Sequence, residues 1–239
     1  MSAGVPDPAP VIAVDGPGGS GKGTLCCRLS EALGFHLLDS GALYRLTALE
    51  AVRRGIPLDH PEALARAAGA LSASFRVSGG DPPVVALLGG EEVQRELRSE
   101  ACADAASRVA ALPAVRAALL ARQRDFRQAP GLVADGRDMG TVVFPDARLK
   151  LFLTASPEVR AERRHKQLIA KGISANVRDL LGDIRERDHR DSSRAIAPLK
   201  PAADAVVIDT SDDSLDSVFG RAMELAASRG VAPPDSGKQ

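Results

Sequence analysis

The sequence of 239 residues is poor in aromatic side chains, which make up 3% of it, with one tyrosine and no tryptophan. Proteins that bind single-stranded nucleic acid stack the bases on aromatic rings, so this composition argues against that class. The net charge is zero, with 31 basic and 31 acidic residues, which also removes the case for a globally basic nucleic-acid binder. We therefore expect no nucleic-acid partner.

Cysteine is also scarce. The three cysteines, Cys26, Cys27 and Cys102, cannot all pair within the chain, and no CxxC or Cys/His spacing typical of a zinc site occurs. No stretch reaches about 18 consecutive apolar residues, and the first residues lack the basic and apolar regions of a secretory leader. These features predict a cytoplasmic protein with no membrane partner, and nothing in them demands more than a monomer.

Arginine carries most of the positive charge and supplies 25 of the 31 basic residues. Guanidinium groups bind phosphate and carboxylate through two parallel hydrogen bonds, which suits a phosphate-handling site. Arginine-rich codon usage across a genome is the alternative explanation and accounts for most of this excess. Only the positions of the arginines can therefore indicate function. The segment from Lys150 to Lys200 has 12 basic and 7 acidic residues. This local excess of positive charge is typical of a mobile segment that covers bound phosphates, and it fits that role better than nucleic-acid binding.

Short apolar segments alternate with longer amphipathic ones along the chain. Five of them are typical of buried strands, namely 11–14, 35–38, 132–134, 149–153 and 205–208. Predicted helices follow at 22–33, 41–54, 113–128, 157–171, 175–194 and 214–227. This order predicts an α/β fold with a doubly wound, five-stranded parallel sheet, whose ligands bind at the carboxyl ends of the strands.

The alternation is interrupted between residues 56 and 112. A helical segment at 61–73 is followed there by two β-like runs, 74–77 and 84–88, on either side of a turn rich in glycine and proline. We predict an inserted subdomain over 56–112 and a core over 11–55 and 113–228. A short lid is expected within that core at about 158–192, and flexible tails at 1–10 and 229–239.

A glycine-rich loop follows the first predicted strand. It reads Gly16-Pro17-Gly18-Gly19-Ser20-Gly21-Lys22 and matches the pattern GxxxxGK at the start of a helix. In such a P-loop the backbone N–H groups bind an anion and the lysine reaches the β- and γ-phosphates. The pattern predicts a nucleoside triphosphate site. Gly23 stands where this pattern usually has Ser or Thr, and Thr24 comes one residue later. We therefore predict no direct protein ligand for a metal ion, with the hydroxyl of Thr24 as the one candidate.

One face of the predicted helix 175–194 is apolar in its first half and charged in its second half. Its buried face is expected to consist of Val177, Leu180, Leu181 and Ile184, and to continue with Arg187, Asp191 and Arg194. A buried charge is costly unless a partner binds it, so the last three residues predict an anionic ligand. The alternative is a set of surface ion pairs on a helix that ends near Ser192.

Two polar segments follow predicted strands. The strand at 132–134 is followed by Asp135-Gly136-Arg137-Asp138, which we interpret as part of a functional site. The alternative is a plain turn, in which Asp and Gly occur because they suit its backbone geometry. Asp39-Ser40-Gly41 follows the strand at 35–38, with Ser40 as the expected N-cap of a helix that also presents Tyr44 and Arg45. Both segments are expected at the sheet edge beside the P-loop.

The chain resembles the bacterial type of cytidylate kinase in four segments: Asp15–Thr24, Leu37–Arg45, Ala134–Thr141 and Arg187–Pro198. The P-loop is generic, whereas LLDSGALYR and ADGRDMGTVVFPDA are specific to this family, and the resemblance runs in order from about Val11 to Ala227. It implies a parallel core, a monophosphate-binding insert and a short lid. It also implies transfer of the γ-phosphoryl of ATP to CMP or dCMP with Mg²⁺.

The resemblance further implies roles for individual residues. Ser107, Arg116 and Asp138 would read the cytosine, Arg187 and Asp191 the ribose, and Arg45, Arg137 and Arg194 the phosphates, while Ser40 and Tyr44 would line the acceptor pocket. Lys22, Arg137 and Arg194 would be the catalytic residues. From the sequence alone, Ser107 and Arg116 are equally consistent with surface positions on helices.

Phosphoryl transfer between phosphates needs positioning and charge neutralisation rather than a general base, so the four histidines need no catalytic role. Two other functions fit part of the sequence. One is a kinase of the same fold for UMP, AMP, dTMP or a small alcohol, although the arginines favour a phosphorylated acceptor. The other is a nucleotide switch without catalysis, but no guanine-reading NKxD motif occurs. We therefore expect an enzyme whose partners are small nucleotides.

Overall fold

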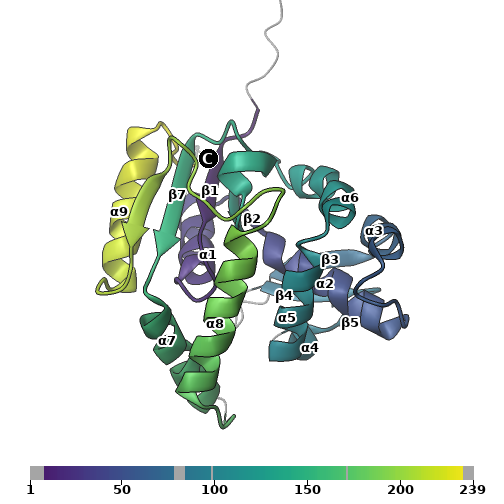
Figure 1. Cartoon of the computed structure of the whole chain (residues 1–239). Coiled ribbons are helices and arrows are strands. Elements are labelled where there is room, and N and C mark those ends of the chain that lie inside the picture. Colours follow the sequence, from purple (N-terminus) through teal and green to yellow (C-terminus); the bar gives the residue numbers. More distant parts are fainter. Residues whose placement is uncertain (1–7, 78–83, 98, 171, 234–239) are drawn as a thin grey trace, which may run out of the picture.

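The computed structural model describes residues 8–77, 84–97, 99–170 and 172–233, which form a central parallel sheet flanked by helices and a smaller antiparallel sheet (Figure 1). The predicted turn at 79–83 and the outer parts of both predicted tails, 1–7 and 234–239, lie outside these residues. Within the described part of the chain, no helix combines the length and the apolar composition needed to cross a membrane.

The central sheet has the strand order β2-β6-β1-β7-β8, and all its pairings are parallel. Its strands are β1 (Val11–Asp15), β2 (His36–Asp39), β6 (Leu132–Gly136), β7 (Leu149–Thr154) and β8 (Val206–Asp209). The predicted α/β fold with five parallel strands is therefore confirmed. The register places Asp39 opposite Asp135 and Asp15 opposite Gly136, so three strands end at the same edge.

Helices cover both faces of this sheet. They are α1 (Lys22–Leu33), α2 (Ser40–Arg53), α6 (Pro113–Arg124) and α9 (Leu215–Ser228). In β1, Val11 and Ala13 belong to the core shared with α2 and α6, whereas Ile12 and Val14 belong to the core shared with α1 and α9. Successive side chains of a strand point to opposite faces, so an unbroken apolar run is what a strand covered on both sides requires.

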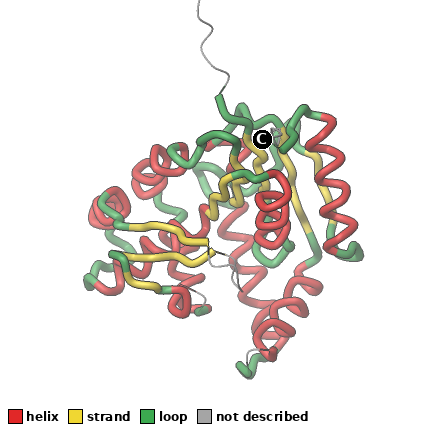
Figure 2. Tube along the Cα trace, turned by 180° about the vertical axis from the view of Figure 1, so that it is seen from behind, coloured by secondary structure: helices red, strands yellow, loops and turns green. Residues whose placement is uncertain are grey.

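The segment 56–112 carries a small antiparallel sheet, which Figure 2 shows from behind apart from the central sheet, while Leu64 and Val109 of this segment belong to the core beside β1. It contains α3 (Pro61–Gly69), β3 (Ala73–Val77), β4 (Val84–Leu88), β5 (Glu91–Glu92), α4 (Gln94–Leu97) and α5 (Glu100–Val109). The helix predicted to reach residue 73 ends at Gly69, because Ala73 pairs with Leu88 in the antiparallel sheet. Tertiary pairing overrides the helical preference of this alanine.

Two further helices, α7 (Pro157–Ala170) and α8 (Val177–Ser192), pack on each other and extend away from the sheet (Figure 1). Their shared apolar contacts centre on Ala161, Leu168 and Leu180. The prediction that Val177 is buried was wrong, since it is 38% exposed. It is the first residue of α8, directly after the N-cap Asn176, and its side chain lies outside the apolar cluster to which Leu180 belongs.

The expected N-cap role of Ser40 was also wrong. Asp39 caps α2, because its carboxylate accepts a hydrogen bond of 2.9 Å from the N–H of Ala42. Asp39 is also the last residue of β2, paired with Asp135, so strand and helix adjoin directly and α2 begins one residue earlier than expected. Ser40 is consequently the first helical residue, and it is buried.

Candidate active site

The P-loop connects β1 to α1 through a backbone that only glycine adopts easily. Gly16 has a φ of 146°, and a Cβ on it would lie 2.0 Å from the carbonyl oxygen of Leu153 on the neighbouring β7. The hydroxyl of Ser20 donates to the carbonyl of Pro17 at 3.0 Å and closes the turn. The loop therefore packs directly on the sheet, and α1 begins immediately after it.

Lys22 is buried at the base of this loop. Its Nζ donates to the carbonyl oxygen of Pro17 at 2.8 Å and lies 4.0 Å from Oδ1 of Asp135. Burial, reinforced by the positive charge of Arg137, lowers the pKa of Lys22 to about 8. A bound anion would oppose both effects, so this ammonium group favours an anionic ligand.

One cavity of about 240 Å³ opens beside the loop, between the edge of the central sheet, α2, α5, α6, α7 and α8. Gly18 and Gly19 line it. It is also lined by all ten residues expected around an acceptor nucleotide, namely Ser40, Tyr44, Arg45, Ser107, Arg116, Arg137, Asp138, Arg187, Asp191 and Arg194. Residues from five separate segments of the chain are therefore brought together.

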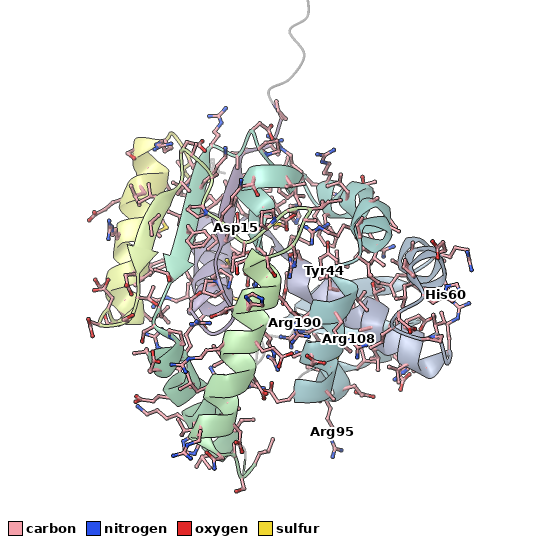
Figure 3. The ribbon with its side chains drawn as sticks, viewed as in Figure 1. Asp15, Tyr44, His60, Arg95, Arg108 and Arg190 are labelled. Carbon is pink, nitrogen blue, oxygen red and sulfur yellow. The ribbon has the colours of Figure 1, made fainter. Side chains whose placement is uncertain are left out.

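Arg116 and Asp138 form an ion pair inside the cavity, where both side chains are less than a tenth exposed. Nη1 of Arg116 also donates to the carbonyl of Ala110 at 3.1 Å, and its guanidinium lies 5.6 Å from the ring centre of Tyr44, which Figure 3 labels in the interior. The surface interpretation of Arg116 was therefore wrong. The pair presents a fixed donor and acceptor set to the cavity.

Ser107 also points away from the surface. Its Oγ is buried in the cavity wall and has no hydrogen-bond partner among the described residues. Buried hydroxyl groups nearly always have a partner, so an unsatisfied one in a cavity wall is typical of a ligand-binding position.

The charged continuation of α8 turns inward as predicted at Asp191. Its two carboxylate oxygens accept from Arg137, at 3.0 Å from Nε, and from Arg194. Burial lowers the pKa of Arg194. The negative charge of Asp191 raises this pKa, whereas the positive charges of Arg116 and Arg137 lower it further. Arg187 is more exposed and pairs instead with Glu100 at 2.6 Å.

Arg45 and Ser40 approach the cavity from α2. Arg45 donates from Nη1 to the carbonyl of Leu97 at 2.8 Å, which ties α2 to α4. Ser40 Oγ lies 2.8 Å from where a Cβ on Gly136 would be, so β6 passes close to this hydroxyl only because residue 136 is glycine. The segments after β2 and β6 thus meet as predicted.

Asp15 is a buried residue whose role was not predicted. Its carboxylate accepts from the N–H groups of Met139 and Gly140 at 2.7 and 2.8 Å, at the start of the π-helical turn Met139–Val143. Burial raises the pKa of Asp15 to about 6, although the two backbone hydrogen bonds lower it. Asp15 thereby holds the segment directly after Asp138. The only signal in the sequence was an acidic residue at the end of an apolar strand.

Arg160 and Glu100 also line the cavity without having been predicted. Arg160 is buried, and its Nη1 donates to the carbonyl of Gly18 at 3.1 Å and to Asp188 of α8 at 3.0 Å. Arg160 of α7 therefore connects the P-loop to α8.

A divalent cation would find few protein ligands here. The described residues contain no group of three or more His, Cys, Asp or Glu side chains that could hold a metal ion. Asp135 offers a partly buried carboxylate beside the loop, with Oδ2 3.5 Å from where a Cβ on Gly23 would be. Desolvation raises its pKa to about 6, although the charge of Lys22 lowers it. Mg²⁺ commonly uses one or two carboxylates together with substrate phosphates, so this donor set fits it.

The family model described as cytidylate kinase matches residues 12–228 of the chain. A cytidylate kinase from Paraburkholderia phymatum is 58% identical over 215 residues, which cover 90% of this chain and 92% of that protein. One from Aeromonas hydrophila subsp. hydrophila is 56% identical, with 90% and 93% covered, and one from Aeromonas salmonicida is 54% identical, with 93% and 96% covered.

Proposed function

This chain belongs to the cytidylate kinase family and is therefore a phosphotransferase, and we propose that it transfers the γ-phosphoryl group of ATP to CMP or dCMP, which yields ADP and CDP or dCDP. The observation that carries the proposal is the single cavity lined both by the P-loop and by the ten residues expected around the acceptor. A donor in the loop and an acceptor in the cavity would have their phosphates in one site.

The triphosphate of ATP would lie in the P-loop, from Gly16 to Thr24. Lys22 is held by the carbonyl of Pro17 and would exchange this weak partner for the β- and γ-phosphates. This exchange replaces a neutral oxygen by a charged one around a buried ammonium group, and charge-assisted hydrogen bonds are the stronger kind.

The acceptor nucleotide would be oriented by its base and its sugar. Ser107, Arg116 and Asp138 combine a hydroxyl, a guanidinium and a carboxylate, which together can both donate to and accept from the edge of cytosine. Arg187 and Asp191 would bind the ribose, while Ser40 and Tyr44 would line the pocket. Arg45 would hold the acceptor phosphate from the α2 side.

Charge neutralisation would come from Lys22, Arg137 and Arg194, which we propose as the catalytic residues. The shared carboxylate of Asp191 fixes Arg137 and Arg194 before any ligand binds, so little reorganisation is needed when negative charge spreads in the transition state. The acceptor phosphate oxygen is largely ionised near neutral pH, so no general base is required.

When bound, a Mg²⁺ ion would supply positive charge that neutralises the phosphate groups. Asp135 is the residue that would hold it, with the hydroxyl of Thr24 as the second candidate. We further propose that 56–112 acts as the monophosphate-binding subdomain and about 158–192 as the lid that excludes water from the γ-phosphate. The monomeric state and the cytoplasmic location stay predictions from the sequence.

The test is a coupled assay of ADP formation from ATP and Mg²⁺ with CMP, dCMP, UMP, AMP and dTMP as acceptors. We expect kcat/KM to be highest for CMP or dCMP. Equal or faster turnover of AMP or dTMP would contradict the proposed acceptor while leaving the kinase assignment intact. Loss of ADP formation without an acceptor serves as the control for hydrolysis of ATP by water.

A further inference from the structure

Helix α5 presents two carboxylates one turn apart to the lid helices. Glu100 accepts from Nε of Arg164 on α7 at 2.7 Å and from Nη2 of Arg187 on α8 at 2.6 Å. Asp104, four residues later, accepts from Nη2 of Arg190 on α8 at 2.7 Å. Residues i and i+4 lie on the same face of a helix, so one face of α5 binds three guanidinium groups of the lid.

These ion pairs span an interface that lacks a shared apolar core. The lid helices pack around Ala161, Leu168 and Leu180, and α5 contributes Ala106 and Val109 to the main core. Among the described residues, no apolar cluster contains side chains from both α5 and the lid. The cavity lies between them instead, lined by Glu100 and Ala106 on one side and by Leu180 and Arg187 on the other.

The charges at this interface are partly exposed, and Asp104 is the most exposed of them at 45%. The side chains of Glu100 and Arg187 are 35% and 26% exposed. Burial would raise the pKa of Glu100, but the hydrogen bonds from Arg187 and Arg164 outweigh it and hold the pKa below its usual value. Glu100 is therefore ionised at neutral pH and remains a partner for both arginines. Figure 3 labels Arg190 on α8, which carries the third pair.

We propose that Glu100 and Asp104 form an ionic latch that holds the lid helices against the 56–112 subdomain and positions Arg187 at the cavity. Both are positioning residues, since they act through the arginines. The role of the latch in catalysis rests on the proposed function, whereas its role in lid order does not. A latch made of ion pairs without an apolar core can open to admit nucleotides and close at little cost.

The principal test compares wild type with the double variant Glu100→Gln and Asp104→Asn by hydrogen exchange of the ligand-free protein. We expect the amides of α7 and α8 to exchange several-fold faster in the variant, because the open lid is more populated, and the amides of the central sheet to be unchanged. The matched control is Glu158→Gln. Glu158 pairs with Arg185 at 2.8 Å within the lid and not across the interface, so its loss should change lid exchange little.

Kinetics give the second test. If the lid-closed state is less populated, KM for CMP rises, on the order of 3–10-fold, while kcat stays within about twofold. The KM of the double variant divided by the KM of wild type should approach one when KCl is raised from about 0.05 M to about 0.5 M, because salt weakens the latch in wild type as well. Glu158→Gln should show no such increase.

Unchanged exchange of α7 and α8 in the double variant would overturn the latch. A lower KM for CMP would also overturn it, since it would mean that Glu100 competes with the nucleotide for Arg164 and Arg187. The exchange experiment involves no turnover, so it tests the latch even if CMP proves not to be the acceptor.

Discussion

Arg137 donates from Nε to Oδ2 of Asp191 at 3.0 Å, and this contact joins the residue after β6 to the last turn of α8. The other oxygen of Asp191 accepts from Arg194, so one buried carboxylate holds two guanidinium groups from segments more than 50 residues apart in the sequence. Two guanidinium groups thus share one carboxylate, which leaves a surplus of positive charge at this point of the cavity. Such a surplus favours anionic ligands.

Replacing Arg194 by alanine should lower kcat by about two to three orders of magnitude, because one fixed donor to the transferring phosphoryl group is lost. The fold should tolerate the change, since Asp191 keeps its hydrogen bond to Arg137. The coupled assay measures kcat, and a thermal melt measures Tm. An unchanged kcat would remove Arg194 from the catalytic residues.

Replacing Ser107 by alanine should raise KM for CMP roughly tenfold, the effect of about 1.4 kcal/mol, and reduce the preference for CMP over UMP. The folded protein should lose no stability, because the hydroxyl has no partner among the described residues. Ser99→Ala is the converse control. Ser99 caps α5 by accepting from the N–H of Cys102, so its loss should cost about 1 kcal/mol of stability and leave KM unchanged.

Replacing Gly16 by alanine should destabilise the protein by roughly 2–4 kcal/mol, because the new Cβ would meet the Leu153 carbonyl and the φ of 146° is strained for alanine. Urea denaturation measures this change. Gly220→Ala is the matched control, since Gly220 lies within α9 and has nothing within 4 Å of its added Cβ. That substitution should stabilise the helix by roughly 0.5–1 kcal/mol. Equal effects at both positions would contradict the strain argument.

The pKa of Asp15 predicts a pH-dependent stability. The folded state raises this pKa from 3.8 to about 6, so it keeps the proton at pH values where the unfolded chain has lost it. The stability that Asp15 contributes therefore falls as pH rises from about 4 to about 6 and is constant above that range.

The measurement for Asp15 is the difference in unfolding free energy between wild type and Asp15→Asn, followed by urea denaturation from pH 4 to pH 7. This difference should decrease by roughly 2–3 kcal/mol with rising pH. Asp146→Asn gives a control of opposite sign, because the Arg127 hydrogen bond lowers the pKa of Asp146 and its contribution is lost only as pH falls. A pH-independent difference for Asp15→Asn would contradict the prediction.

Several contacts in the site were not predictable from local patterns. Ser40 was expected to cap α2, but the carboxylate of Asp39 takes that role and the helix starts one residue earlier. The burial of Arg116 depends on Asp138, which is 22 residues away, and neither side chain signals the pair in its own segment. Glu100 meets Arg187 of α8 only because α5 and α8 lie on opposite sides of the cavity.

The sequence by itself determined the parallel sheet, the P-loop and the polar segments at the strand ends, because apolar periodicity and glycine spacing are local properties that survive any arrangement of the rest. Only the tertiary structure decided which charges become partners, since the pairs Arg116–Asp138, Arg137–Asp191 and Arg187–Glu100 each join segments at least 22 residues apart. Burial then sets the strength of each pair, because the cost of an unpaired charge depends on the surroundings that other elements supply.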